Sequence, residues 1–156
     1  MTAGNETRTG DKLPGAVLFM CGMNSIRSPI AEAIARHALP KSIYVASAGV
    51  RRGERDPFVD VVLDEIGLDL GRHQPHILDD LEDDYFDLIV TLAPEAHHKA
   101  LELTRAWPVD VEYWPTPDPT VATGKREQIL DAYRGVRDHI ARLVDSRLAA
   151  KARRGA

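Results

Sequence analysis

Two residues with complementary chemistry stand six positions apart in this chain. Cys21 can act as a nucleophile once its thiol is ionised, and Arg27 can grip two oxygens of a tetrahedral oxyanion with its planar guanidinium. Cys21 is the only cysteine, which excludes an intramolecular disulfide and a cysteine-rich zinc site. This pair predicts thiolate attack on a bound oxyanion, with a phosphocysteine intermediate if the ligand is a phosphate ester.

The segment between these two residues is predicted to form an anion-binding loop. It follows an apolar run at residues 16–20, which is typical of a buried parallel strand, and precedes Ser28 and Pro29, which are typical of a helix start. A sharp turn there would direct successive backbone N–H groups and a helix N-terminus at one point. The same field stabilises a thiolate, and the Ser28 hydroxyl is near enough in sequence to donate to the sulfur. The predicted phosphate-binding residues are Gly22, Met23, Asn24, Ser25, Ile26 and Arg27.

Hydrolysis of a phosphate ester also requires a proton for the departing oxygen, and Asp118 is the best candidate donor. It lies in a proline-rich loop that follows the fourth predicted strand. An aspartate before a proline is often only a turn residue, but this loop is expected at the same sheet edge as Cys21. The predicted catalytic residues are therefore Cys21, Arg27 and Asp118.

The elements that would position these residues alternate regularly. Strands are predicted at 16–20, 43–48, 86–92 and 109–113, and helices at 28–39, 56–66, 94–103 and 125–148. This order predicts an α/β fold with a single domain, in which a four-stranded parallel sheet carries helices on both faces. Ligands bind such sheets at the carboxyl ends of the strands, where Cys21 is expected.

The predicted domain occupies residues 15–148. Residues 1–14 are polar and contain glycines and a proline, so we expect a flexible N-terminal arm, and residues 149–156 are expected to form a basic, frayed C-terminal tail. The net charge of −4 gives no basic footprint for nucleic acid. No apolar run could span a membrane and the N-terminus has no signal-peptide core, so we expect a cytoplasmic protein. No histidine spacing matches a metal site, and we expect no metal and no cofactor.

The segment VLFMCGMNSIRSPIAEAI, together with Asp118-Pro119, resembles the low-molecular-weight protein tyrosine phosphatases. The resemblance covers residues 17–144 and includes SAGV at 47–50, DLIVTL at 87–92 and the last helix. It implies that Cys21 is the nucleophile, that Arg27 binds phosphate, and that Asp118 is the general acid and then the base for water. It also implies that Asn24 and Ser28 support the loop and the thiolate, and that Ser47 braces Asn24. The implied substrate is a phosphorylated protein or a small phosphomonoester.

The chain departs from the phosphatase pattern at the substrate pocket. Ile26 replaces a second loop cysteine, and Met23 stands where a glycine is usual. The aromatic residue that normally follows the Asp-Pro pair is Thr120, and Arg51 and Arg52 follow SAGV without an aromatic residue. These aromatic residues enclose a phenyl ring in tyrosine phosphatases, so their loss weakens the case for phosphotyrosine proteins as substrates. Tyr113 and Trp114 could supply a wall, although core packing is the favoured interpretation for both.

Other segments resemble the thioredoxin-coupled arsenate reductases, namely VTLAPEA, YWPTPDPTVATG and AYRGVRDHIARLV. That family uses two further cysteines, whose matching positions here are Ala93 and Ala100, so an intramolecular disulfide relay cannot operate. We therefore predict phosphate monoester hydrolysis. Arsenate reduction with an external small thiol is one alternative. A non-catalytic oxyanion-binding regulatory protein is another, which the joint presence of the three catalytic candidates disfavours.

Overall fold

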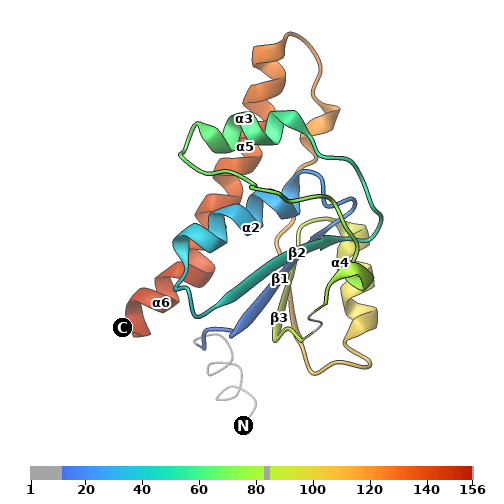
Figure 1. The fold of residues 1–156 in the computed structure, drawn as a ribbon, viewed down its shortest axis with the longest axis vertical. Helices are drawn as coiled ribbons and strands as arrows, with labels where there is room; N and C mark the ends of the chain where they lie inside the picture. Colours follow the sequence, from blue (N-terminus) through green and yellow to red (C-terminus); the bar gives the residue numbers. More distant parts are fainter. Residues whose placement is uncertain (1–11, 83–84, 156) are drawn as a thin grey trace.

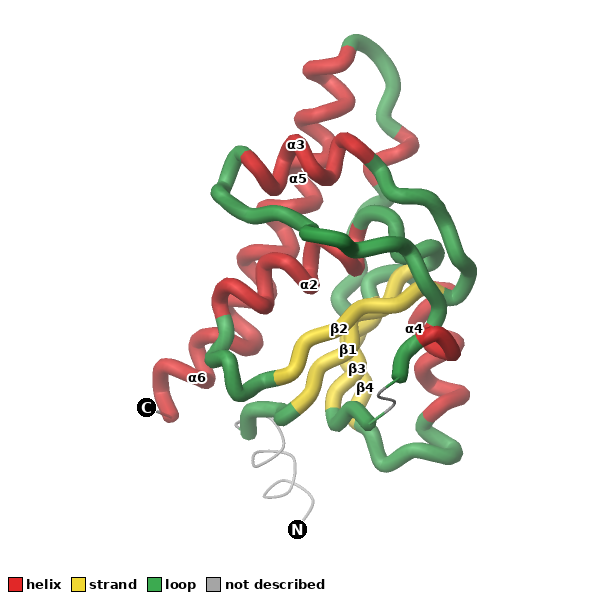
Figure 2. The backbone as a smooth tube through the Cα atoms, in the orientation of Figure 1, coloured by secondary structure: helices red, strands yellow, loops and turns green. Residues whose placement is uncertain are grey.

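The four strands form one parallel sheet. The computed structural model describes residues 12–82 and 85–155, so most of the predicted arm at 1–14 lies outside the described residues. The strands are β1 (Ala16–Cys21), β2 (Tyr44–Gly49), β3 (Leu88–Thr91) and β4 (Asp110–Tyr113). They are arranged in the order β2-β1-β3-β4, and every neighbouring pair is parallel (Figure 1 and Figure 2). This confirms the predicted α/β fold with a four-stranded parallel sheet.

The register brings the carboxyl ends of all four strands to one edge. Cys21 is paired with Gly49 across β1 and β2, and Met20 is paired with Thr91, which is itself paired with Tyr113. The connections that leave these strands therefore start side by side, as the loops above the sheet in Figure 2 show. The loop after β1 and the loop after β4 carry the catalytic candidates, and both begin at this edge.

Helices cover both faces of the sheet. On one side of the sheet lie α2 (Arg27–Ala38) and α5 (Arg126–Val144), with α3 (Pro57–Asp64) packed against α5, while α4 (Pro94–Leu103) covers the other face (Figure 1). Alternation along the strands sends successive side chains to opposite faces. The strand residues facing the three helices are Val17, Phe19, Cys21, Val45, Leu88 and Val90, and those facing α4 are Leu18, Met20, Ala46, Ala48 and Ile89.

The helix starts follow local sequence rules with one exception. Asp56 caps α3 by accepting a hydrogen bond from the Phe58 amide at 2.9 Å, and prolines occupy the first turns of α3 and α4. The exception is Ser28, which we expected to cap α2. The helix already begins at Arg27, its N-cap residue is Ile26 without a side-chain hydrogen bond, and Ser28 is fully buried inside the first turn.

The C-terminal helix differs from the expected helix and frayed tail. α5 ends at Val144, a π-helical turn follows at η3 (Asp145–Ala149), and α6 (Ala150–Gly155) continues the chain. Leu148 and Ala149 are buried in the core, which anchors the π-helical turn and keeps the following residues helical. Two short 3-10 turns, η1 (Leu78–Asp80) and η2 (Pro119–Val121), complete the fold. Within the described part of the chain, no helix has the length and apolar character needed to cross a membrane.

Candidate active site

The loop between β1 and α2 has its carbonyl groups turned away from its centre. The carbonyl oxygens of Cys21, Gly22 and Met23 accept hydrogen bonds from the amides of Val50, Arg51 and Gly53 at 3.2, 2.8 and 3.0 Å. In a planar trans peptide the next N–H points opposite to the carbonyl. The segment after β2 thus binds the outer side of the loop through these hydrogen bonds. The amides of Gly22, Met23 and Asn24 then face inward and form a nest for an anion.

Asn24 fixes the shape of this loop. Its backbone has a φ of 58°, in the left-handed region that asparagine tolerates better than most residues. Its side chain is fully buried and donates from Nδ2 to the hydroxyls of Ser28 and Ser47, both at 2.9 Å. Its Oδ1 accepts from the backbone amide of His76 at 3.1 Å. The side-chain amide of Asn24 thus forms three hydrogen bonds, with partners that are distant from one another in sequence.

These contacts leave the Ser28 hydroxyl free to donate to the sulfur. Ser28 accepts a hydrogen bond from Asn24, so its hydroxyl hydrogen can be directed at Cys21 Sγ, which lies 2.9 Å away. Ser47 likewise accepts from Asn24 and donates to Glu32 Oε1 at 2.5 Å. When the buried Cys21 is ionised, its sulfur can only accept, and the Ser28 hydroxyl is then its donor.

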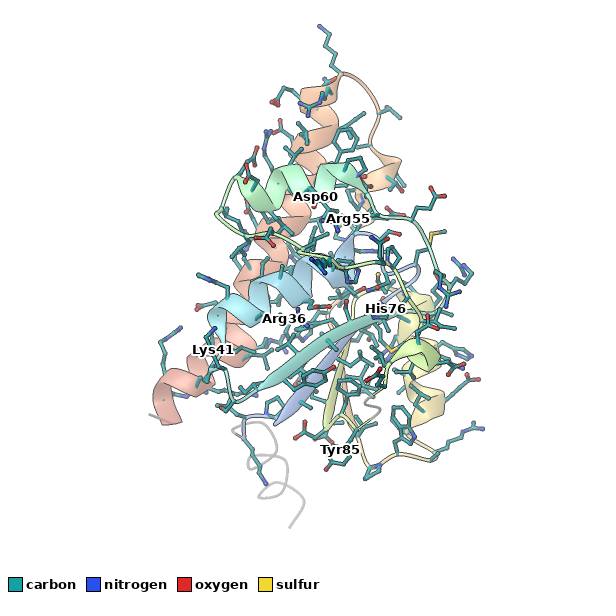
Figure 3. The ribbon with its side chains drawn as sticks, viewed as in Figure 1. Arg36, Lys41, Arg55, Asp60, His76 and Tyr85 are labelled. Atoms are coloured by element: carbon teal, nitrogen blue, oxygen red, sulfur yellow. The ribbon has the colours of Figure 1, made fainter. Side chains whose placement is uncertain are left out.

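Two histidines contact backbone carbonyl oxygens at the outer side of the loop. The sequence does not identify either of them as a site residue. His73 Nε2 lies 3.4 Å from the Asn24 carbonyl oxygen, and His76 Nε2 lies 2.6 Å from the Ser47 carbonyl oxygen. Figure 3 labels His76 beside the end of β2. Burial lowers the pKa of His73, and the opposing charge of Glu32 only partly offsets this. His73 therefore adds little positive charge to the loop at neutral pH.

Arg27 connects the loop to the segment that carries Asp118. Its Nη1 donates to the carbonyl oxygen of Thr116 at 3.0 Å, across 89 residues of sequence. Thr116 is itself buried and its amide donates to the Leu92 carbonyl at 3.1 Å, continuing the sheet beyond β4. These bonds hold the segment before Asp118 at the carboxyl edge of the sheet, next to the Cys21 loop.

The surroundings of Asp118 lower the pKa of its carboxyl in the ligand-free protein. Burial raises the pKa of this carboxyl, but the hydrogen bonds from the Thr120 amide and hydroxyl and the positive charge of Arg27 outweigh it, so the pKa is lowered overall. The Thr120 amide and hydroxyl lie 2.9 and 2.7 Å from Asp118 Oδ1. The other carboxyl oxygen, Asp118 Oδ2, takes part in neither hydrogen bond and is available to a ligand.

The three catalytic candidates line one pocket of about 330 Å³. Gly22, Met23, Ser25 and Ile26 line the pocket with them, while Arg51, Glu95 and Thr120 complete its rim. The Ser25 hydroxyl is buried and is the only buried side-chain oxygen or nitrogen without a hydrogen-bond partner in the described parts of the chain. It lies beside Gly53, on the side of the loop that faces the segment after β2.

Neither Tyr113 nor Trp114 lines this pocket. Trp114 is buried and packs against Phe19 with ring centroids 5.9 Å apart, as expected of a core residue. Tyr113 is partly exposed and stacks on His97 at 4.6 Å. The lining contains no aromatic residue at all, so the wall that encloses a phenyl ring is missing. Over residues 12–82 and 85–155, no group of three or more His, Cys, Asp or Glu side chains is arranged to hold a metal ion.

The fold and loop define a class of proteins that bind a tetrahedral oxyanion beside a cysteine at the end of the first strand. The profile of the family described as "Low molecular weight phosphotyrosine protein phosphatase" matches residues 16–153, and the chain belongs to this family. The family contains enzymes of more than one activity, as its individual members show.

Curated relatives with high similarity are arsenate reductases. That of Shouchella clausii is 33% identical over 125 residues, which cover 80% of this chain and 88% of the relative. Among solved structures, an arginine phosphatase from Geobacillus stearothermophilus superimposes with a TM-score of 0.75 at 23% identity, covering 91% and 95% of the two chains. An arsenate reductase from Archaeoglobus fulgidus gives 0.59 at 28% identity, covering 82% and 98%. The two activities are thus represented on the same fold.

Gly49 provides a test of the close contact between β2 and the loop. A Cβ at this position would lie 2.6 to 2.8 Å from backbone atoms of Arg51, Met23 and Asn24, which cannot move without shifting the loop. We expect Gly49→Ala to destabilise the protein by about 1–3 kcal/mol and to weaken binding of inorganic phosphate. Urea unfolding and calorimetry would measure both effects.

Gly135 in α5 is the matched control for this substitution. It is an exposed helical glycine around which a Cβ would meet nothing within 4 Å. Gly135→Ala should stabilise the protein by about 0.5–1 kcal/mol and leave phosphate binding unchanged. If Gly49→Ala were as stable and bound phosphate as well as the wild type, the loop would not depend on this contact.

Proposed function

We propose that this protein hydrolyses phosphate monoesters through a phosphocysteine on Cys21. The observation that carries the proposal is that a thiol hydrogen-bonded to Ser28, an oxyanion nest with Arg27 and a carboxyl at Asp118 lie together at one small pocket. The pocket therefore holds a nucleophile, a charge-stabilising group and a proton carrier together.

The reaction proceeds in two displacements. The Cys21 thiolate attacks phosphorus while the P–O bond to the leaving group breaks, and Asp118 supplies the proton that the leaving oxygen takes. The inward-facing amides and Arg27 hold the three equatorial oxygens as charge shifts in the transition state. Asp118, now ionised, accepts a proton from water, which attacks phosphorus and breaks the P–S bond to release phosphate.

The substrate is proposed to be a small phosphomonoester or a phosphorylated protein, with no cofactor. The reaction consumes only water, so the pocket needs no redox partner. The missing aromatic wall argues against a flat phenyl leaving group, because nothing in the lining would stack on it.

Arsenate reduction is the second candidate, and the names of the curated relatives favour it. Arsenate has the same tetrahedral shape as phosphate, so the same nest would accept it. Reduction of As(V) to As(III) takes two electrons, which two thiols supply when they join in a disulfide. Cys21 is the only thiol of the chain and Ala93 and Ala100 are buried, so the second thiol would be a small external one.

The need for a thiol separates these candidates. We would measure hydrolysis of p-nitrophenyl phosphate by the wild-type protein with and without a small thiol, and reduction of arsenate under the same two conditions. Thiol-independent hydrolysis without arsenate reduction supports the phosphatase. Thiol-dependent arsenate reduction without hydrolysis overturns it in favour of the reductase, and phosphate binding without either activity identifies an oxyanion-binding protein.

A further inference from the structure

The rim of the pocket carries two opposite charges and no aromatic side chain among the described residues. Arg51 and Glu95 are the lining residues outside the loop and the Asp118 segment. Arg51 Nη1 donates to Glu95 Oε2 at 2.5 Å and Nη2 donates to Oε1 at 3.1 Å, so the guanidinium and the carboxylate meet in a two-pronged pair. We call this the rim pair.

The rim pair is held against the anion-binding loop. The Arg51 amide donates to the Gly22 carbonyl at 2.8 Å, which fixes the backbone of Arg51 to the loop. Glu95 lies in the first turn of α4, and a Cβ on Gly22 would run into its Oε1. Both charged groups therefore stand directly beside the position that a phosphate leaving group must occupy.

Each member of the pair keeps binding capacity for a ligand. The Arg51 side chain is 58% exposed and that of Glu95 is 40% exposed. A guanidinium has five N–H donors and the pair uses two of them, while the carboxylate retains free lone pairs on both oxygens. A ligand can thus bind to both groups without separating them.

The charge balance around a bound phosphate indicates which leaving group fits. Arg27 is occupied by the phosphate, and Asp118 is neutral once it holds the proton for the leaving oxygen. The rim then presents one positive and one negative group, from Arg51 and Glu95. A singly charged leaving group pairs with only one of them, whereas an aryl group pairs with neither.

We propose that the rim pair selects phosphate monoesters whose leaving group is a small zwitterion, with an ammonium directed to Glu95 and a carboxylate to Arg51. O-phosphoserine has this chemistry, since one short alcohol carries both charges beside the ester. This inference rests on the proposed phosphatase activity and assigns its substrate class.

The test compares kcat/KM for four small esters that differ in leaving-group charge. These are O-phosphoserine, phosphoethanolamine, phosphoglycolate and glycerol phosphate, with p-nitrophenyl phosphate as the activated reference. We expect O-phosphoserine to exceed glycerol phosphate by about tenfold, with roughly threefold from each charge, as is typical of exposed charge pairs. Equal values for O-phosphoserine and glycerol phosphate would overturn the inference.

Substitutions assign each preference to one side chain. Arg51→Gln should remove the preference for the carboxylate and keep that for the ammonium, and Glu95→Gln should do the reverse. Arg52→Gln is the matched control, because Arg52 pairs with Asp80 and does not line the pocket. An equal loss in Arg52→Gln would mean that the general charge of the segment, not the rim pair, sets the preference, and would overturn the proposal.

The outcome for p-nitrophenyl phosphate distinguishes a failure of the rim-pair inference from a failure of the proposed phosphatase function. If this ester is hydrolysed and the four alkyl esters show no dependence on charge, only the rim-pair inference fails. If no ester is hydrolysed, the proposed function fails and the inference fails with it.

Discussion

Replacing Cys21 by serine is expected to lower turnover of p-nitrophenyl phosphate by at least about 10⁴-fold, which in practice abolishes it. The nucleophile is then an alcohol, which ionises far less readily than a thiol, and the group in contact with residue 21 is the Ser28 hydroxyl, which is not a base. Steady-state hydrolysis by wild type and Cys21→Ser measures the effect.

Binding of the oxyanion should be retained in Cys21→Ser. Loss of turnover with retained binding would therefore report on the nucleophile and not on the folding of the loop. The amides of the nest and Arg27 are unchanged, so inorganic phosphate should still stabilise Cys21→Ser against unfolding. At a hundredfold excess over its dissociation constant the ligand contributes about 2.7 kcal/mol. Loss of both turnover and phosphate binding would mean that the variant has a disrupted loop. Retained turnover would remove Cys21 from the mechanism.

Local sequence rules predict the strands and most helix starts of this protein. The apolar runs become β1 and β3 because both faces of the sheet are covered, and Asp56 and the prolines start helices because their effect on the backbone is local. Pairing of parallel strands then places Cys21 and the loop after β4 at one edge. The position of the pocket therefore follows from topology alone.

The contacts that give the loop its shape are less accessible from sequence. Ser28 is an example, because its position before Pro29 suits a helix cap, yet its hydroxyl lies between Asn24 and Cys21. The choice between these roles depends on where Asn24 points, which is fixed by Ser47 and by the His76 amide. A small side chain can serve either role, so only the tertiary contacts decide.

The residues that sequence analysis missed are joined to the loop across long separations. Glu32 reaches the loop through Ser47, His73 contacts the Asn24 carbonyl 49 residues away, and Thr116 meets Arg27. One signal was present, because pairing the first two strands would have placed Gly49 opposite Cys21. A glycine at that point indicates a close backbone approach, here by the loop.

The second large effect is expected for Asp118→Asn, and it should depend on the leaving group. An asparagine cannot supply a proton, so kcat/KM should fall by roughly 10²–10⁴ for alkyl esters, whose leaving oxygen needs one. For p-nitrophenyl phosphate the same parameter should change little, because p-nitrophenolate leaves without protonation. Measuring kcat/KM for both ester types on wild type and variant tests the acid role. Equal losses would exclude it.

The pH dependence of the wild-type enzyme follows from the lowered pKa of Asp118. The free carboxyl loses its proton at lower pH than an ordinary aspartate, because the Thr120 hydrogen bonds and Arg27 outweigh the effect of burial. A phosphate ester loses its second proton near pH 6. As the pH rises above about 6, neither partner brings the proton that an alkyl leaving group needs, so kcat/KM for alkyl esters should fall.

Asp118→Asn should also separate the two chemical steps with p-nitrophenyl phosphate. Formation of the phosphocysteine no longer needs the carboxyl, but attack by water still lacks its base, so the second step becomes limiting. We expect a burst of p-nitrophenol equal to the enzyme concentration, followed by slow turnover, with phosphate attached to Cys21 detectable by mass spectrometry. The wild-type protein serves as the control, since the ionised Asp118 oxygen outside the Thr120 contacts is available to accept the proton from water. A variant that shows neither a burst nor slowed turnover would place the base of the second step elsewhere in the pocket, with Glu95 as the nearest remaining carboxylate of the lining.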